Sequence, residues 1–345
     1  MERSLSGSIH SFVKGNGSIL QECDVEEGDE YEAIKVKQNV CYIVAAIVID
    51  DNGRVLMVQE AKVSCYKKWY LPAGRMEPNE TIVEAVKREV LEEAGLEFEP
   101  TSLLCVEECG GRWVRFALVG KVTGGKLKTT EEADEESLQA MWWDREEKIQ
   151  IRCKDVLPLI ELGVKRHETD PSKSVVLLPS LEPQKLLFIR ALMIYKQPAN
   201  DQDISILLEQ TSFENREESS NVDDKGKYCV PTSRIHQDDI SFHRAVHAIC
   251  KDLLQLNQHS DYSITILGVM NIEHTGASSM GHDGLGVSII VELKIDNSCN
   301  GPPICKPNYK WVKLSELPVD ENVTLLKKKL NPSNLIPLRS LKAKL

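Results

Sequence analysis

Three glutamates, Glu89, Glu92 and Glu93, stand close together between Gly74 and Leu96. Residues three and four apart share one face of an α-helix, so a helix here would gather the three carboxylates into one patch. Like charges at this spacing repel one another unless a cation neutralises them. Hard divalent ions take oxygen ligands, and Mg²⁺ usually combines one or two carboxylates with substrate phosphates. The segment therefore predicts a place where Mg²⁺ bridges a diphosphate to the protein.

The residues around these glutamates support that prediction. Glu80 stands six positions after Gly74, Arg88 directly precedes the first glutamate, and Gly95 stands two positions after the last. We expect Arg88 to pair with a carboxylate and hold it in place, and Glu80 to orient the cluster. The alternative for both is an ordinary surface ion pair. For the whole segment the alternative is an exposed acidic helix face, against which the Gly, Arg and aliphatic positions argue.

The segment fits the Nudix box, G-x5-E-x7-R-E-U-x-E-E-x-G-U with U aliphatic, at every specified position. Those positions are Gly74, Glu80, Arg88, Glu89, Val90, Glu92, Glu93, Gly95 and Leu96. The chain therefore resembles the Nudix hydrolases, and the resemblance covers about residues 36–165. It implies an α/β/α sandwich, a loop-helix-loop box, and attack by water on a phosphorus of a nucleoside diphosphate derivative.

The same resemblance implies a set of metal ligands. Glu89, Glu92 and Glu93 would bind Mg²⁺, or Mn²⁺ in its place, together with the backbone carbonyl of Ala73. Either Glu92 or Glu89 would deprotonate the attacking water, and the sequence does not choose between them. Nudix enzymes often recruit a further carboxylate from a loop before a late strand. Glu136 fits this role best, with a solvated loop as the alternative.

The resemblance also extends to the substrate. The run Trp69–Pro78 and the strand before it are most similar to the MutT-related branch of the family. This implies cleavage of oxidised purine nucleoside diphosphates, such as 8-oxo-dGDP, to the monophosphate and phosphate, which keeps damaged nucleotides out of replication. Leu56 and Gly74 would then contact the substrate and Arg88 would act in catalysis. The alternative for Leu56 is a core strand residue.

Two other functions stay open at this point. One is hydrolysis of another nucleoside diphosphate derivative, such as ADP-ribose. The other is a nucleotide-binding scaffold without catalysis. Asn79 stands where the related enzymes commonly have Gly, a difference that leaves the chemistry intact but bears on the turn.

Charge and composition exclude several classes of protein. The formal net charge of -11 argues against wrapping DNA or RNA, which normally needs a basic face. The longest purely apolar run, Ile43–Ile49, is far short of the roughly 20 residues that cross a bilayer. The ten cysteines form no C-x-x-C pair, so reduced thiols are expected. We therefore expect a soluble cytoplasmic protein with a small nucleotide as its partner; the oligomeric state stays open.

Local patterns predict an α/β fold with a helix packed on a sheet. Thr81 fits an N-cap with Glu84 as the other half of a capping box. The helix should run to about Ala94, where Gly95 stops it. Strands are expected at 40–49, 55–58, 103–107, 113–122 and 139–143, and a second helix at 154–164.

The pattern recurs later in the chain at a spacing of 159 or 160 residues, which suggests a duplicated domain. Val230–Arg234 echoes Leu71–Arg75, and residues 241–256 echo the first helix. The expected later strands are 187–195, 204–209, 264–273, 285–294 and 309–312. In place of the three glutamates stand Ala248 or Ile249, Lys251 or Asp252, and Asp252 or Leu253.

These patterns predict four segments. Residues 1–35, with eight acidic against three basic side chains, are expected to be a disordered acidic tail. Residues 36–165 would form the catalytic domain and 166–184 a linker. Residues 185–345 would form a degenerate, non-catalytic Nudix-like domain, because at most one of the three acids is retained.

Overall fold

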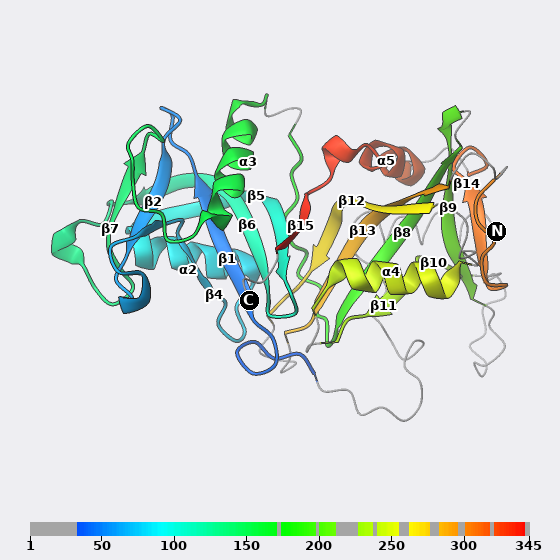
Figure 1. Ribbon diagram of the computed structural model, residues 1–345, viewed down its shortest axis with the longest axis horizontal. Helices are drawn as coiled ribbons and strands as arrows, with labels where there is room; N and C mark the ends of the chain where they lie inside the picture. The colour runs from blue at the N-terminus through cyan, green and yellow to red at the C-terminus, as the bar shows by residue number, and fades with distance from the viewer. Residues whose placement is uncertain are drawn as a thin grey trace.

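The computed structural model places two halves side by side, each built from twisted β-strands and helices (Figure 1). The structure describes residues 33–170, 174–197, 200–211, 227–236, 240–254, 262–276, 283–295, 301–317 and 321–341. Residues 1–32 of the expected tail lie outside these ranges. So do residues 171–173 of the expected linker and 255–256 of the expected second-half helix.

The first half contains two sheets, with strand orders β15-β5-β6-β1-β4 and β3-β2-β7. Its strands are β1 (Tyr42–Val48), β2 (Val55–Glu60), β3 (Trp69–Tyr70), β4 (Ala73–Arg75), β5 (Leu96–Cys109), β6 (Trp113–Gly125) and β7 (Ser137–Trp143). Its helices are α2 (Ile82–Ala94) and α3 (Leu157–Glu168), with 3-10 turns η1 (Val63–Cys65), η2 (Thr130–Glu132) and η3 (Lys154–Val156). β15 comes from the C-terminal end of the described chain.

Strand β1 lies between two hydrophobic cores. Val44 belongs to the cluster that contains Val86 of α2, whereas Ile47 belongs to the cluster that contains Leu159 of α3. Side chains alternate across a strand, so each face of the central sheet is covered by a different helix. The expected α/β/α sandwich is confirmed.

Local signals set the ends of α2 as expected. The Thr81 side chain accepts a hydrogen bond from the Glu84 N–H, and the Glu84 carboxylate accepts from the Thr81 N–H, which completes the capping box. Gly95 ends the helix with φ +72°. Asn79, in the turn before the helix, has φ +68°. It therefore adopts the left-handed conformation that Gly favours, and the turn is kept without Gly.

Other elements differ from expectation at their ends. β5 begins at Leu96 rather than at 103, because it pairs along most of its length with β6 in one long hairpin. α3 begins at Leu157, since Pro158 suits only the first turn of a helix, and it continues to Glu168, into the expected linker. Residue 34, placed in the expected disordered tail, is instead a buried core isoleucine.

The second half repeats the fold. Its strands are β8 (Leu187–Gln197), β9 (Asn200–Thr211), β10 (Lys227–Cys229), β11 (Thr232–Arg234), β12 (Tyr262–Glu273), β13 (Leu285–Ile295) and β14 (Tyr309–Lys313). Its helices are α4 (Phe242–Leu253) and α5 (Glu321–Lys329), followed by the 3-10 turn η6 (Pro332–Asn334) and by β15 (Leu338–Leu341). Among the described residues, no helix combines the length and apolar character needed to span a membrane.

Strand pairing shows the duplication directly. β8 lies between β13, in parallel, and β11, antiparallel, as β1 lies between β6 and β4. Gly74 of β4 faces Val44, and Ser233 of β11 faces Ile189 in the same way. One difference is that β9 pairs with β8, so the second half has one continuous sheet.

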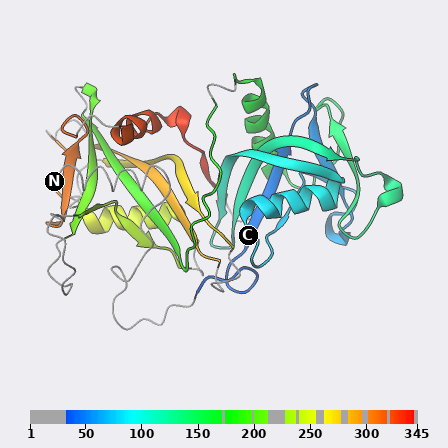
Figure 2. The same ribbon diagram turned by 180° about the vertical axis from the view of Figure 1, so that it is seen from behind.

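Two extended segments join the halves (Figure 2). The first lies in the expected linker: Leu177 accepts a hydrogen bond from Leu103 of β5 at 2.7 Å, and Ser180 donates one to Ile272 of β12 at 2.8 Å. The second is β15 with the residues before it, where Ile336 bridges to Val269 of β12 and β15 pairs in parallel with β5. Residues 174–184 are therefore part of the packed junction rather than a loose linker.

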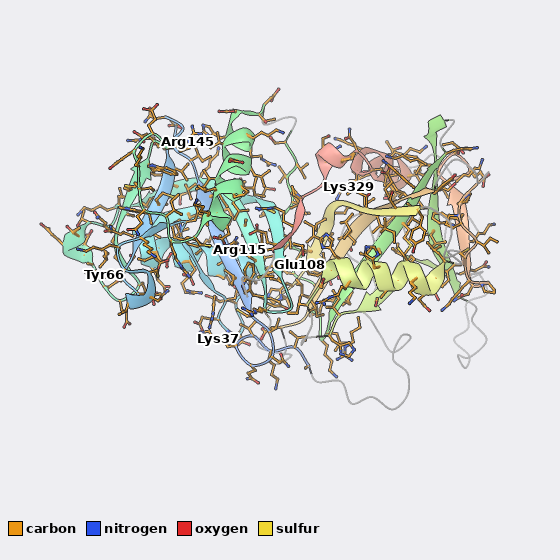
Figure 3. The ribbon with its side chains drawn as sticks, in the orientation of Figure 1. Lys37, Tyr66, Glu108, Arg115, Arg145 and Lys329 are labelled. Atoms are coloured by element: carbon orange, nitrogen blue, oxygen red, sulfur yellow. The ribbon has the colours of Figure 1, made fainter. Side chains whose placement is uncertain are left out.

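A buried carboxylate from the first half caps a helix of the second. Glu108, at the end of β5, points at the start of α4 (Figure 3). It accepts hydrogen bonds from the Phe242 N–H, the Ser241 hydroxyl at 3.2 Å and the Ser340 hydroxyl at 2.8 Å. His243 Nδ1 lies 2.9 Å away. Burial opposes its charge, but hydrogen bonds from His243, Ser340 and Phe242 prevail and lower the Glu108 pKa.

We expect Glu108→Ala to lower the free energy of unfolding by about 2 kcal/mol, because the Phe242 N–H at the start of α4 and two hydroxyl donors lose their buried acceptor. Urea denaturation measures the change. Glu99→Ala is the matched control on the same strand. Its carboxylate makes an exposed ion pair with Lys87, worth less than about 1 kcal/mol. Equal destabilisation by the two substitutions would contradict the assigned cap.

Candidate active site

The glutamates of α2 meet the backbone of β4. Glu89 and Glu93 are only 6% and 4% exposed. The Ala73 N–H donates a hydrogen bond to Glu93 Oε2 at 2.9 Å. A Cβ atom at Gly74 would lie 2.1 Å from Glu89 Oε1, so only Gly lets the strand approach this carboxylate. β4 thus brings its backbone against two buried acids.

Arg88 joins the remaining carboxylates. Its Nε and Nη2 donate to the two oxygens of Glu80 at 2.5 and 2.9 Å. Its Nη1 donates to Glu89 at 2.8 Å and to Glu92 at 2.9 Å, and Nη2 also reaches the Arg75 carbonyl at 3.1 Å. The bidentate pair fixes the plane of the guanidinium, so Arg88 can hold Glu89 and Glu92 in register.

Burial dominates the ionisation of the two inner acids. Desolvation raises the pKa of Glu93 well above its ordinary value of 4.5, and the nearby charge of Glu89 adds to the shift. Desolvation likewise raises the pKa of Glu89, although Arg88 opposes it. Glu80 is the opposite case: burial disfavours its charge, but the hydrogen bonds from Arg88 prevail and lower its pKa.

This donor set fits a divalent cation. Buried carboxylates with raised pKa values are poorly compensated by the protein, and a hard cation with oxygen ligands would stabilise their charged form. Within the described ranges, no three Asp, Glu, His or Cys side chains already stand together as a metal site. Arg88 donates hydrogen bonds to oxygens of Glu89 and Glu92, and the Ala73 N–H donates one to an oxygen of Glu93. A cation must therefore compete with these hydrogen bonds for the carboxylate oxygens.

Two further acids lie near the inner glutamates. Glu136 is half exposed, 3.8 Å from the Lys62 ammonium, and its charge contributes to the raised pKa of Glu89. Glu60, at the end of β2, is buried and pairs with Arg152 at 2.5 Å, and its charge contributes to the raised pKa of Glu93. Sequence reasoning missed Glu60, because a single acid at the end of an apolar strand gives no signal of its own.

The structure does not place Leu56 at an open surface. Leu56 is fully buried in the first core cluster and pairs with Trp142 across β2 and β7. This position matches the alternative of a core strand residue. Substrate contact by Leu56 therefore gains no support from the structure.

The second half presents a different helix face at the equivalent place. The N-caps, Thr81 and Ser241, set a spacing of 160 for the helices, which aligns Glu89 with Ile249, Glu92 with Asp252 and Glu93 with Leu253. Ile249 and Leu253 are buried. Asp252 is exposed and pairs with Lys306 at 2.7 Å. Apolar side chains thus occupy the positions of the two buried acids.

Comparison with known proteins identifies the family. The NUDIX domain model matches residues 41–156. The chain is 35% identical over 341 residues to 8-oxo-dGDP phosphatase NUDT18 of Mus musculus, covering 97% of this chain and 98% of that protein. It is 33% identical over 346 residues to 8-oxo-dGDP phosphatase NUDT18 of Danio rerio, covering 98% of each.

Solved structures give shorter matches. The crystal structure of a NUDIX hydrolase from Nitrosomonas europaea is 30% identical and covers 39% of this chain and 77% of that chain, with a TM-score of 0.35. The curated relatives, in contrast, align with both halves. With its complete box from Gly74 to Leu96 and this full-length similarity, the chain belongs to the Nudix hydrolase family.

Proposed function

We propose that this Nudix hydrolase cleaves 8-oxo-dGDP and related oxidised purine nucleoside diphosphates to the monophosphate and phosphate. The observation that carries the proposal is the pair of buried acids, Glu89 and Glu93, packed against the backbone of β4. Arg88 joins Glu89 to Glu80 and Glu92. The substrate class is supported by relatives named 8-oxo-dGDP phosphatase that align over nearly the whole chain.

The proposed cofactor is Mg²⁺, with Mn²⁺ as a substitute. Glu89, Glu92 and Glu93 would hold it, with the Ala73 carbonyl and Glu136 as further ligands. When bound, the metal orients the diphosphate and lowers the pKa of water. The Glu92 side chain is 44% exposed, so it has access to water that the buried glutamates lack. We propose that Glu92, rather than Glu89, accepts the proton of the attacking water.

The second half is proposed to be a non-catalytic domain, with the catalytic domain at residues 36–165 and the other at 185–345. Support comes from the apolar residues Ile249 and Leu253 on α4 and from Ser233 at the position of Gly74.

The cytoplasm is the proposed compartment. The described cysteines are free thiols, the state that a reducing compartment maintains.

A substrate panel tests the function. With Mg²⁺, chromatographic separation of nucleotide products should give the highest kcat/KM for 8-oxo-dGDP among 8-oxo-dGDP, dGDP, 8-oxo-dGTP and ADP-ribose. Glu92→Gln should lower kcat about a thousandfold, whereas Asp252→Asn at the equivalent position should not. If ADP-ribose were the only good substrate, the substrate assignment would be wrong. No turnover of any nucleotide would favour a scaffold.

Gly74→Ala should lower kcat about a hundredfold with little loss of folding stability, because the new methyl group displaces the Glu89 carboxylate. Ser233→Ala is the matched control at the equivalent position of the second half and should leave kcat unchanged. Steady-state kinetics and urea unfolding measure both effects. Full activity of Gly74→Ala would show that the close approach of β4 to Glu89 is unimportant.

The raised pKa values of Glu89 and Glu93 predict a pH-dependent response to Mg²⁺. A carboxyl whose pKa is raised by folding stabilises the fold below its unfolded pKa, and this contribution is lost as pH rises through the folded pKa. In metal-free protein the contribution of these two carboxyls to stability should therefore fall as pH rises above 4.5, and Mg²⁺ should restore it. The increase in Tm caused by Mg²⁺ should grow with pH. An increase that is independent of pH would contradict this reasoning.

A further inference from the structure

The loop that leads into the catalytic helix lies against the second half. We call residues 77–81 the box loop. Gly276 approaches it so closely that a Cβ atom would lie 2.1 Å from the Glu80 carbonyl oxygen. The buried His274 ring places Nε2 3.3 Å from the same oxygen and Nδ1 3.0 Å from the Gly284 carbonyl. Two residues of the second half thus lie against the Glu80 carbonyl.

A buried carboxylate adds a second point of attachment. Asp283 is only 6% exposed. One of its oxygens accepts the Asn79 N–H at 3.4 Å and the other accepts the Val36 N–H at 2.9 Å. Its own N–H donates to the Ile34 carbonyl at 2.6 Å. Asp283 therefore ties the box loop to the N-terminal segment as well as to its own half.

The box loop needs such support because of its backbone. Asn79 has φ +68°, a conformation that costs free energy for any residue with a side chain, although Asn tolerates it better than most. The Asn79 N–H donates a hydrogen bond to the Asp283 carboxylate. The hydrogen bond therefore acts at the residue where the loop would most readily relax to another conformation.

From the box loop the attachment continues to the acids. The Glu80 carbonyl lies against the second half, while both oxygens of its side chain bind Arg88. Arg88 in turn binds Glu89 and Glu92. A shift of the Glu80 backbone therefore moves the guanidinium, and with it two of the proposed metal ligands.

We propose that Asp283, Gly276 and His274 are positioning residues through which the second half holds the box loop, and with it Arg88 and the metal-binding glutamates, in the geometry for hydrolysis. This inference rests on the proposed function. It gives the second half a part in catalysis although its own helix lacks the acids. Partners that orient metal ligands commonly change metal affinity or activity about tenfold to a hundredfold when removed.

The test compares full-length variants without and with substrate. Mn²⁺ binding, followed by the loss of free-ion signal in electron paramagnetic resonance, should weaken at least about tenfold in Asp283→Ala. The kcat for 8-oxo-dGDP should fall by a similar factor, while KM changes little. Gly276→Ala should act in the same direction, because its methyl group pushes the Glu80 carbonyl. Asp283→Asn, which keeps one accepting oxygen, should retain part of the Mn²⁺ affinity.

Ser340→Ala is the matched control, because it weakens the junction at Glu108 without touching the box loop. It should lower the unfolding midpoint in urea but leave Mn²⁺ affinity unchanged. Wild-type Mn²⁺ affinity in folded Asp283→Ala and Gly276→Ala would overturn the inference. If Asp283→Ala does not fold, the milder Asp283→Asn decides it. Wild-type protein without any turnover would instead refute the proposed function, while the Mn²⁺ measurement would still judge the positioning role.

Discussion

The charge balance around Arg88 is the constraint on which the rest of the site depends. The box places carboxylates on one face of α2, and the fold buries Glu89 and Glu93 almost completely. Taking such charges out of water costs several kcal/mol each unless they are paired. Arg88 compensates part of this cost by binding Glu80, Glu89 and Glu92 at once. Glu93 has an N–H donor instead, so the cluster retains negative charge for a cation.

The second half solves the same packing problem without charge. Ile249 and Leu253 occupy the places of Glu89 and Glu93 and join the hydrophobic core. Replacing buried charges by apolar side chains of similar size is often neutral or stabilising, so this helix needs no cation to be stable. The two halves therefore share the strand pairing around β1 and β8, but α2 buries carboxylates where α4 buries apolar side chains. What the second half keeps is a packed core and a surface that contacts the box loop of its neighbour.

Local chemistry made a large part of this structure predictable. The ends of α2 follow from Thr81, Glu84 and Gly95, and the repeat follows from similar patterns at a spacing of 159 or 160 residues in β4 and α2. The junction follows from no local pattern. Glu108 and Phe242 are 134 residues apart, and Asn79 and Asp283 are 204 apart, so only the tertiary fold brings them together. The burial of Ile34 could not be predicted either, because a single apolar residue in an acidic segment shows no periodicity.

The junction also explains why the halves should be treated as one unit. Without β15 and the segment around Leu177, one edge of β5 would expose unpaired backbone groups, which proteins normally cover. Glu107 of β5 would at the same time lose Arg339 of β15, an ion-pair partner at 2.7 Å, and keep only its ion pair with Arg115 among the described residues. The same edge carries Glu108, whose side chain accepts hydrogen bonds from described residues of the second half and of β15. A change in the second half that loosens this edge therefore lowers the stability of the first half as well, because β5 belongs to the same sheet as β1 and β6.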